Sequence, residues 1–249
     1  MHRLMWLLAA LAGLASVAAP LPATAQLAAD EAPVVVELYT SQGCNSCPPA
    51  DDLLAQLAKR ADVVALGLHV DYWDYLGWND IFADHRHTER QQAYARGFGQ
   101  RGVYTPQMVI GGRSQHIGSA REGILATIEG EKASPEMRIA VKLRRLDELL
   151  LVQLAAGPYQ GDATIWLFAY EQRALTEIKR GENAGKTIAY HNIVRGLRNL
   201  GMWRGQSMEI AVQSTDLFRG ERDGCAVVVQ LGMTGPVLGA AKLDQPRKR

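Results

Sequence analysis

The chain has 249 residues, of which 47% are hydrophobic and 21% are charged, an ordinary balance for a globular protein. A formal net charge of +1 gives no general support for a nucleic-acid partner, and three cysteines are too few for a disulfide-stapled scaffold. The length allows one large domain or two small ones.

The first 25 residues are typical of a signal peptide. His2 and Arg3 give a basic start, residues 4–19 form an uncharged and mostly apolar run, and Ala23-Thr-Ala25 supplies a small-x-small cleavage pattern. We predict cleavage after this pattern and an exported protein, periplasmic or secreted, with no stable membrane insertion. The alternative is an uncleaved anchor, because the apolar run is borderline in length for a span. Export would place the cysteines in an oxidising compartment, where a disulfide persists.

A Cys-x-x-Cys motif follows the first predicted strand. The β-branched run over residues 34–39 predicts a buried strand, and apolar residues at helical spacing after Cys47 predict a helix with Pro48 and Pro49 in its first turn. Cys44 would then lie at a helix N-terminus, where unpaired N–H groups and the macrodipole stabilise a thiolate. Cys47, one turn later, can close a disulfide with it. The pair is a candidate redox couple.

The next segments predict a strand, a loop and a helix. Residues 62–70 are apolar and predict a second buried strand, parallel to the first. Residues 71–80 hold four aromatic and three acidic side chains, which indicates either a loop closing over the core or a substrate-facing lid beside the cysteines. Residues 81–99 predict a helix. Its histidines, His85 and His87, do not share a face, which favours a solvated face over a metal site.

A proline then precedes a predicted hairpin. Pro106, preceded by Thr105, comes directly before an apolar run that ends at Ile110, and proline is allowed at a strand start. Gly111-Gly112 is a two-residue hairpin signal. Ser119 is a candidate cap for a last helix over residues 120–129.

The second half of the chain predicts short strands separated by turns, which is typical of an antiparallel sandwich. Ser134-Pro135 is a candidate linker. The glycines of residues 180–186 lack the spacing of a phosphate loop, so this stretch is predicted to be a turn with surface charges. Beyond it, a predicted strand carries His191, Asn192 and Arg195, which could face the first half or a partner.

Taken together, the strand, the Cys-x-x-Cys helix and the Thr-Pro before a hairpin resemble the thioredoxin fold. The segments 37–51, 69–78, 104–107, 180–186 and 191–195 are similar to the secreted family called domain of unknown function 1223. The resemblance implies a thioredoxin-like α/β domain over residues 26–133, followed by an all-β, sandwich-like domain over residues 134–249.

The resemblance also implies roles for site residues. Cys44 would attack a target disulfide and Cys47 would resolve the mixed disulfide. Thr105 and Pro106 would form a cis bond that packs against the pair and shapes a substrate groove. Glu37 lies within an apolar strand, so burial should raise its pKa. It resembles the family's buried acid that moves the resolving thiol's proton, although a partly exposed strand position is the alternative.

The predicted function is therefore an exported thiol–disulfide oxidoreductase acting on protein or small-molecule thiols and disulfides, without a cofactor. The alternatives are a non-catalytic thioredoxin-like binding module with a structural disulfide, or a copper-handling protein that uses His69 and Asp71 with the cysteines. Zinc is disfavoured because a second ligand pair is missing. Cys225 is predicted to be a buried, inert thiol.

Overall fold

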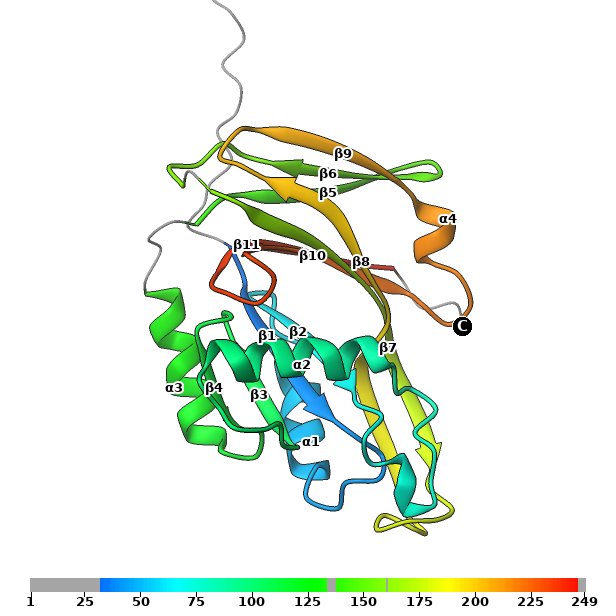
Figure 1. Ribbon diagram of the computed structural model, residues 1–249. Helices are drawn as coiled ribbons and strands as arrows, with labels where there is room; N and C mark the ends of the chain where they lie inside the picture. The colour runs from blue at the N-terminus through cyan, green and yellow to red at the C-terminus, as the bar shows by residue number, and fades with distance from the viewer. Residues whose placement is uncertain (1–31, 134–137, 160, 246–249) are drawn as a thin grey trace, which may run out of the picture.

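The computed structural model describes residues 32–133, 138–159 and 161–245. Two sheets and a set of helices make up this part of the chain (Figure 1). The large sheet has eight strands in the order β11-β10-β7-β8-β2-β1-β3-β4, and the small sheet has three in the order β5-β6-β9.

The strands of the first half are β1 (Val34–Thr40), β2 (Val63–His69), β3 (Gln107–Ile110) and β4 (Ser114–Ile117). Those of the second half are β5 (Val141–Leu146), β6 (Leu149–Leu154), β7 (Ala163–Glu177), β8 (Thr187–Trp203), β9 (Met208–Gln213), β10 (Gly224–Leu231) and β11 (Val237–Asp244). The helices are α1 (Pro48–Leu57), α2 (His85–Gly97), α3 (Arg121–Lys132), α4 (Ser214–Leu217) and the short 3₁₀ helix η2 (Asp74–Leu76).

Strand β1 lies in the middle of the first half and is buried along its whole length. It pairs in parallel with β2 and antiparallel with β3. Because successive side chains of a strand point to opposite faces, Val36 and Leu38 pack with α1 and α3, whereas Val35 and Tyr39 pack with Tyr94 of α2. The sheet therefore separates an α1 face from an α2 face.

The long hairpin of β7 and β8 joins the two halves of the molecule (Figure 1). Strand β8 also pairs in parallel with β2, where Gly67 faces Ile193. The chain approaches closely at this point, because a Cβ on Gly67 would lie 3.1 Å from the carbonyl oxygen of His191. Asn192, with φ at +46°, fastens the junction by donating from Nδ2 to the carbonyl of Ala65 at 2.9 Å.

The small sheet packs against the part of the large sheet that holds β7 and β10 (Figure 1). Its inward side chains, such as Leu150 and Val152 of β6, form a second core with Ile165, Val227 and Leu238. Among the described residues, no helix is long and apolar enough to cross a membrane.

The predicted fold class, a thioredoxin-like α/β domain followed by a separate sandwich, is wrong. The described chain is mostly β-structure, with four short α-helices beside one eight-stranded mixed sheet to which both halves contribute. The physical reason is that β8, predicted as a strand of a separate sandwich, pairs with β7 along one edge and with β2 along the other. The strands of both halves therefore belong to one sheet. The predicted signal peptide and the predicted linker at residues 134–135 lie outside the described residues, and the domain boundaries stay a prediction.

The predictions of individual strands and helices in the first half are closer to the structure. The strand at the start, the Cys-x-x-Cys helix, the second strand and the hairpin all lie close to where the sequence places them. The predicted cap of the last helix is wrong, because α3 begins at Arg121 with Ala120 as its N-cap and no side-chain cap bond.

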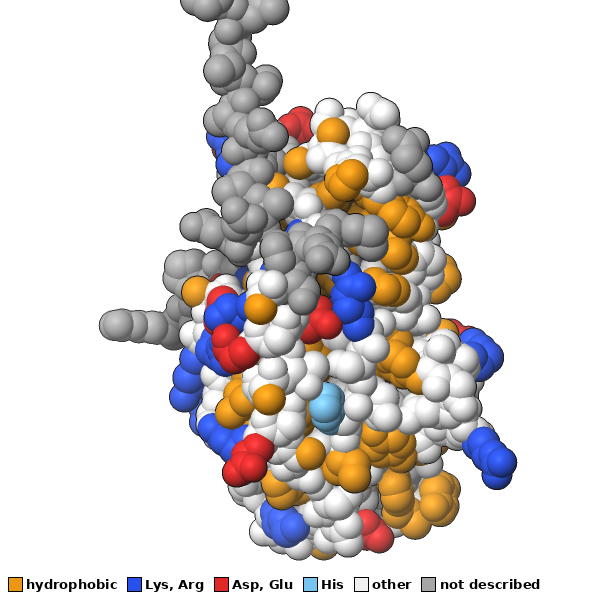
Figure 2. Space-filling view, turned by 90° about the vertical axis from the view of Figure 1, so that its left-hand side faces the viewer, with side chains coloured by type: hydrophobic (Ala, Val, Ile, Leu, Met, Phe, Trp, Pro, Cys, Tyr) orange, Lys and Arg blue, Asp and Glu red, His pale blue; other side chains and the backbone are white. Residues whose placement is uncertain are grey.

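Figure 2 shows one face of the molecule, on which acidic and basic side chains lie next to one another instead of forming a patch of one sign. Ion pairs also occur among the described residues: Arg60 pairs with Asp62 and Glu129, and Lys132 pairs with the same two acids. The face shown therefore lacks the basic stripe that marks a nucleic-acid surface.

Candidate functional site

Cys44 and Cys47 form a disulfide at the N-terminus of α1. Cys47 is the N-cap residue of the helix and already has helical dihedrals, with φ at −78° and ψ at −34°. The turn before it is closed by the N–H of Cys44, which donates to the carbonyl of Ser41 at 3.1 Å. The strand-turn-helix placement predicted for the two cysteines is confirmed.

The first turn of α1 has few N–H groups to offer an anion. Pro48 and Pro49 carry none, and the N–H groups of Ala50 and Asp51 donate to the carbonyl of Cys47 at 2.8 and 3.1 Å. The expected stabilisation of a Cys44 thiolate by these N–H groups is therefore wrong, and the macrodipole remains. A nearby donor is the hydroxyl of Ser46, whose Oγ lies 3.4 Å from the Cys44 Sγ.

The loop between β7 and β8 lies against the cysteine segment. Asn183, which is 1% exposed, donates from Nδ2 to the carbonyls of Gln42 at 3.0 Å and Cys44 at 2.9 Å. The N–H of Asn45 donates to a carboxylate oxygen of Glu182 at 3.3 Å. The sequence predicts only a charged surface turn here, and it gives no sign of the contact because Asn183 follows Cys44 by 139 positions. Cys44 and Cys47 are 1% and 0% exposed, while Asn45 and Ser46 reach the surface.

Thr105 and Pro106 lie beside the same segment, and the predicted cis bond between them is confirmed. Trp73 donates from Nε1 to the Thr105 hydroxyl at 2.8 Å, and its Cβ lies 3.2 Å from where a Cβ on Gly43 would be. A Cβ on Gly118 would lie 2.9 Å from both Ala50 and Pro106, so Pro106 lies close to the first turn of α1.

The aromatic loop over residues 71–80 lies next to the cysteines as the lid interpretation predicts. Besides the Trp73 contact, Trp78 donates from Nε1 to the Gln42 side chain at 2.8 Å. Its role toward a substrate stays a prediction.

Glu37 is 1% exposed and lies on the α2 face of β1. Arg90 donates to its carboxylate at 2.6 and 2.9 Å, Tyr94 at 2.6 Å and Tyr39 at 3.1 Å. Burial alone would raise the pKa of Glu37, but the Arg90 charge and these hydrogen bonds outweigh it and lower the pKa. The predicted rise is therefore wrong, because Arg90 and Tyr94, which bind Glu37, lie on a helix more than 50 residues away.

A second buried acid, Asp51, lies on the α1 face and was missed by the sequence analysis. It is 3% exposed, its Oδ2 has no hydrogen-bond partner, and burial raises its pKa to about 7. His69, a candidate from the sequence, lies nearby: its Nδ1 is 2.7 Å from Asp80 Oδ2, and its ring packs edge-on against Tyr190 with centroids 4.8 Å apart. The sequence holds one signal for Asp51: it lies four residues after Cys47 in the predicted helix, and residues four apart share a helix face.

The remaining candidates have structural partners. Asp71 binds His85, with Oδ2 and Nδ1 2.7 Å apart. The described residues contain no group of three or more His, Cys, Asp or Glu side chains suited to a metal ion. Cys225 is fully buried in β10 between β7 and β11, and burial raises its pKa to about 12, as expected of an inert thiol. Arg195 packs over the Phe82 ring at 4.9 Å, so this side chain faces the first half.

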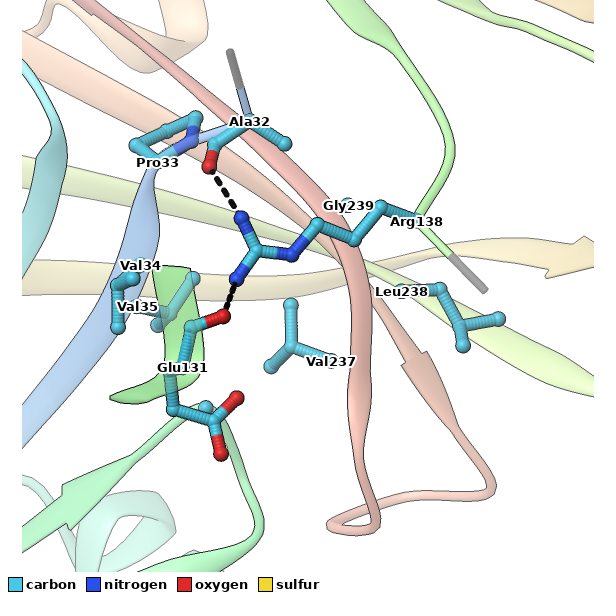
Figure 3. Close-up of a pocket in the computed structure, with 10 residues that line it drawn as sticks. Ala32, Pro33, Val34, Val35, Glu131, Arg138, Val237, Leu238 and Gly239 are labelled. Atoms are coloured by element: carbon cyan, nitrogen blue, oxygen red, sulfur yellow. Dashed lines mark hydrogen bonds between the residues drawn. The ribbon is translucent and has the colours of Figure 1, made fainter. Parts of the chain in front are cut away.

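A small cavity lies at the other end of β1, away from the cysteine loop (Figure 3). Arg138 crosses it, donating to the carbonyls of Ala32 and Glu131. Its volume of about 20 Å³ holds roughly one water, which makes it too small for a substrate.

The chain matches the family described as "Protein of unknown function (DUF1223)" over residues 35–230. It is similar to the crystal structure of protein AGR_C_4864 from Agrobacterium tumefaciens, with 32% identity and a TM-score of 0.77 over 87% of this chain and 96% of that one. It is also similar in fold to HBP35 of Porphyromonas gingivalis, with 14% identity and a TM-score of 0.58 over 86% and 76% of the two chains. A comparison with curated proteins found no match. The chain belongs to the DUF1223 family.

Proposed function

We propose that this protein is an exported thiol–disulfide oxidoreductase whose working couple is Cys44 and Cys47. Cys44 attacks a disulfide in a protein or small molecule, and Cys47 resolves the mixed disulfide. A dithiol partner returns the pair to its reduced form. Export rests on the signal-peptide pattern of residues 1–25.

The observation that carries the proposal is the placement of the disulfide at the N-terminus of α1, with the Ser46 hydroxyl 3.4 Å from the Cys44 Sγ. On reduction, the macrodipole favours the thiolate form of a cysteine at this end of the helix. The Ser46 hydroxyl can donate to a Cys44 thiolate. Exposed Asn45 and Ser46 place this edge of the motif at the surface.

A structural disulfide is the second candidate function of the pair, within a non-catalytic binding module. The burial of both cysteines, at 1% and 0% exposure, favours it, because attack on Cys44 needs access to its sulfur. The contacts of Asn183 and Glu182 with the cysteine segment add to this cover.

Thiol labelling of the reduced protein tests the assignment of the nucleophile. Brief treatment with iodoacetamide at mildly acidic pH should label Cys44 first, because its thiolate is the one favoured. Buried Cys225 serves as an internal control and should stay unlabelled. Preferential labelling of Cys47 in peptide mass maps would contradict the assignment.

Turnover of a disulfide substrate tests the activity itself. Cys44→Ser should abolish the reduction of a disulfide-linked peptide by dithiothreitol through the protein, whereas Cys225→Ala should retain it. Equal rates for wild type and Cys44→Ser would leave the structural disulfide as the better account.

A further inference from the structure

Several buried polar atoms near the disulfide lack partners in the described part of the chain. They are the Thr40 hydroxyl, the Gln42 side-chain nitrogen, Asp51 Oδ2 and the Tyr190 hydroxyl. Unpaired buried polar groups are costly, and they gather where a structure serves a function. Resting on the proposed function, we propose that Asp51 accepts the proton of the Cys47 thiol during disulfide exchange, and that Glu37 does not.

Helix geometry brings Asp51 to Cys47. The N–H of Asp51 donates to the carbonyl of Cys47 at 3.1 Å, which is an i to i+4 bond, and Cys47 itself has helical dihedrals. Side chains at this spacing lie on one face of a helix with Cβ atoms about 5–6 Å apart. Cys47 is 0% exposed, so bulk water does not reach its thiol directly and an internal acceptor is needed.

The surroundings of Asp51 suit a group that changes protonation. The charged and titratable groups around it are His69 from β2, Asp80, Asp52 on its own helix and Tyr190 from β8. Burial and, to a smaller degree, Asp80 and Asp52 oppose the ionised carboxylate, whereas His69 and the nearby Thr40 hydroxyl favour it. The pKa of Asp51, about 7, leaves both forms populated near neutral pH, and a proton acceptor of this kind works best under that condition.

Glu37 lacks these properties. Its side chain lies on the α2 face of β1, whereas α1, the helix that follows the cysteines, lies on the other face. Both of its oxygens are already bound by Arg90. Protonating it would leave the buried Arg90 charge uncompensated, which is strongly unfavourable.

The exchange has two chemical steps. The Cys44 thiolate attacks a substrate disulfide, forming a mixed disulfide and releasing the first substrate thiolate. The Cys47 thiol gives its proton to the Asp51 carboxylate, and the resulting thiolate attacks the Cys44 sulfur. The second substrate thiolate leaves, the Cys44–Cys47 disulfide forms, and the Asp51 proton passes to solvent. The substrate gains the two electrons that the cysteine pair loses.

Single-turnover reaction of the reduced protein with 5,5′-dithiobis(2-nitrobenzoate) separates these steps. The first release of coloured thiolate reports the attack by Cys44, and the second reports resolution by Cys47. Asp51→Asn should leave the first phase unchanged and slow the second about 100-fold, the lower end for a positioned acid–base group. It should also remove an inflection near pH 7 from the second phase, and Asp51→Glu should restore part of the rate.

The matched control is Asp52→Asn, which removes the same charge from the adjacent, exposed position of α1. It should keep the wild-type rate of the second phase and move its inflection only slightly to lower pH, because Asp52 has the smallest of the effects that raise the pKa of Asp51. A normal second phase in Asp51→Asn would overturn the assignment while leaving the oxidoreductase intact. A wild type with no first phase would instead remove the proposed function. If Asp51→Asn does not fold, infrared titration of wild type decides: a carboxylic-acid band that persists above pH 5 and is lost near pH 7 supports the assignment, and its absence overturns it.

Discussion

At the scale of single residues, Glu37 and Asp51 are two buried acids with opposite electrostatic surroundings. Glu37 meets a bidentate arginine and two tyrosine hydroxyls, which hold it as a carboxylate. Asp51 has an unpartnered oxygen, and burial, with a smaller effect of Asp80 and Asp52, raises its pKa to about 7. The difference comes from the two faces of one sheet. It predicts that the two acids affect stability in opposite ways as the pH changes.

Asp51 should make the folded protein less stable as the pH rises. In the unfolded chain the Asp51 carboxyl ionises near its ordinary pKa of 3.8 and in the folded protein at about 7, so the folded state holds more protons between these values. Its free energy of unfolding therefore falls across this window, by up to about 4 kcal/mol at 1.36 kcal/mol per pKa unit. Asp51→Asn should remove this fall. Urea unfolding near pH 4 and near pH 8 measures it, and an equal effect of the substitution at both would contradict the prediction.

Glu37 should make the folded protein more stable as the pH rises. Its folded pKa is lowered, so its stabilising effect is present above the unfolded value of 4.5 and is lost as the pH falls through the folded value. Glu37→Gln leaves buried Arg90 without its counter-charge and should lower the free energy of unfolding near pH 7 by about 3–5 kcal/mol. Denaturant titration checks this, and a loss below about 1 kcal/mol would show that the ion pair is dispensable.

At the scale of elements, the loop between β7 and β8 covers the cysteine segment although it comes from the other half of the chain. Asn183 is its anchor, through bonds to the carbonyls of Gln42 and Cys44. Access to the disulfide therefore depends on an element distant in sequence. The rate at which a reductant reduces the disulfide should therefore depend on the stability of the contacts between the loop and the cysteine segment.

Asn183→Ala should speed reduction of the disulfide by tris(2-carboxyethyl)phosphine about 30-fold. The substitution removes two hydrogen bonds, each worth about 1 kcal/mol, and a change of 1.4 kcal/mol corresponds to a factor of ten. Arg180→Ala changes an exposed side chain of the same loop and serves as the control. An unchanged rate in Asn183→Ala would show that the loop does not limit access.

The elements that the sequence predicts are those with local signals. The β-branched run of β1, the prolines at the start of α1 and the glycine pair between β3 and β4 each act within a few residues. The pairing of β8 with β2 has no such signal, because Ile193 looks the same in a sandwich strand as beside Gly67. The pKa of Glu37 and the burial of Asp51 also depend on distant partners, Arg90 and Tyr190, so the sequence alone points to Glu37 as the proton acceptor, whereas our proposal assigns Asp51.

At the scale of the whole molecule, the eight-stranded sheet binds the two halves into one structure. Strand β8 pairs with β7 over most of its length and touches β2 at a tight junction fastened by Asn192. Strands far apart in the order, such as β1 and β10, therefore belong to one continuous sheet. We expect them to unfold together.

Asn192→Ala should weaken both halves equally. It removes the bond to Ala65 and leaves alanine at a positive φ, for a combined loss of about 2–4 kcal/mol. Native-state hydrogen exchange should show the same loss of protection in peptides from β1 and β10. A loss confined to one of them would show that the halves unfold separately.

The reduction potential of the Cys44–Cys47 couple tests the central claim, that this disulfide is a working redox site. Equilibration of the full chain in glutathione and dithiothreitol buffers, with thiol trapping and mass mapping, gives the value, and Cys225→Ala should give the same one. We predict a potential above about −250 mV, in the range of catalytic couples. A potential below about −300 mV would be that of a structural disulfide and would contradict the account.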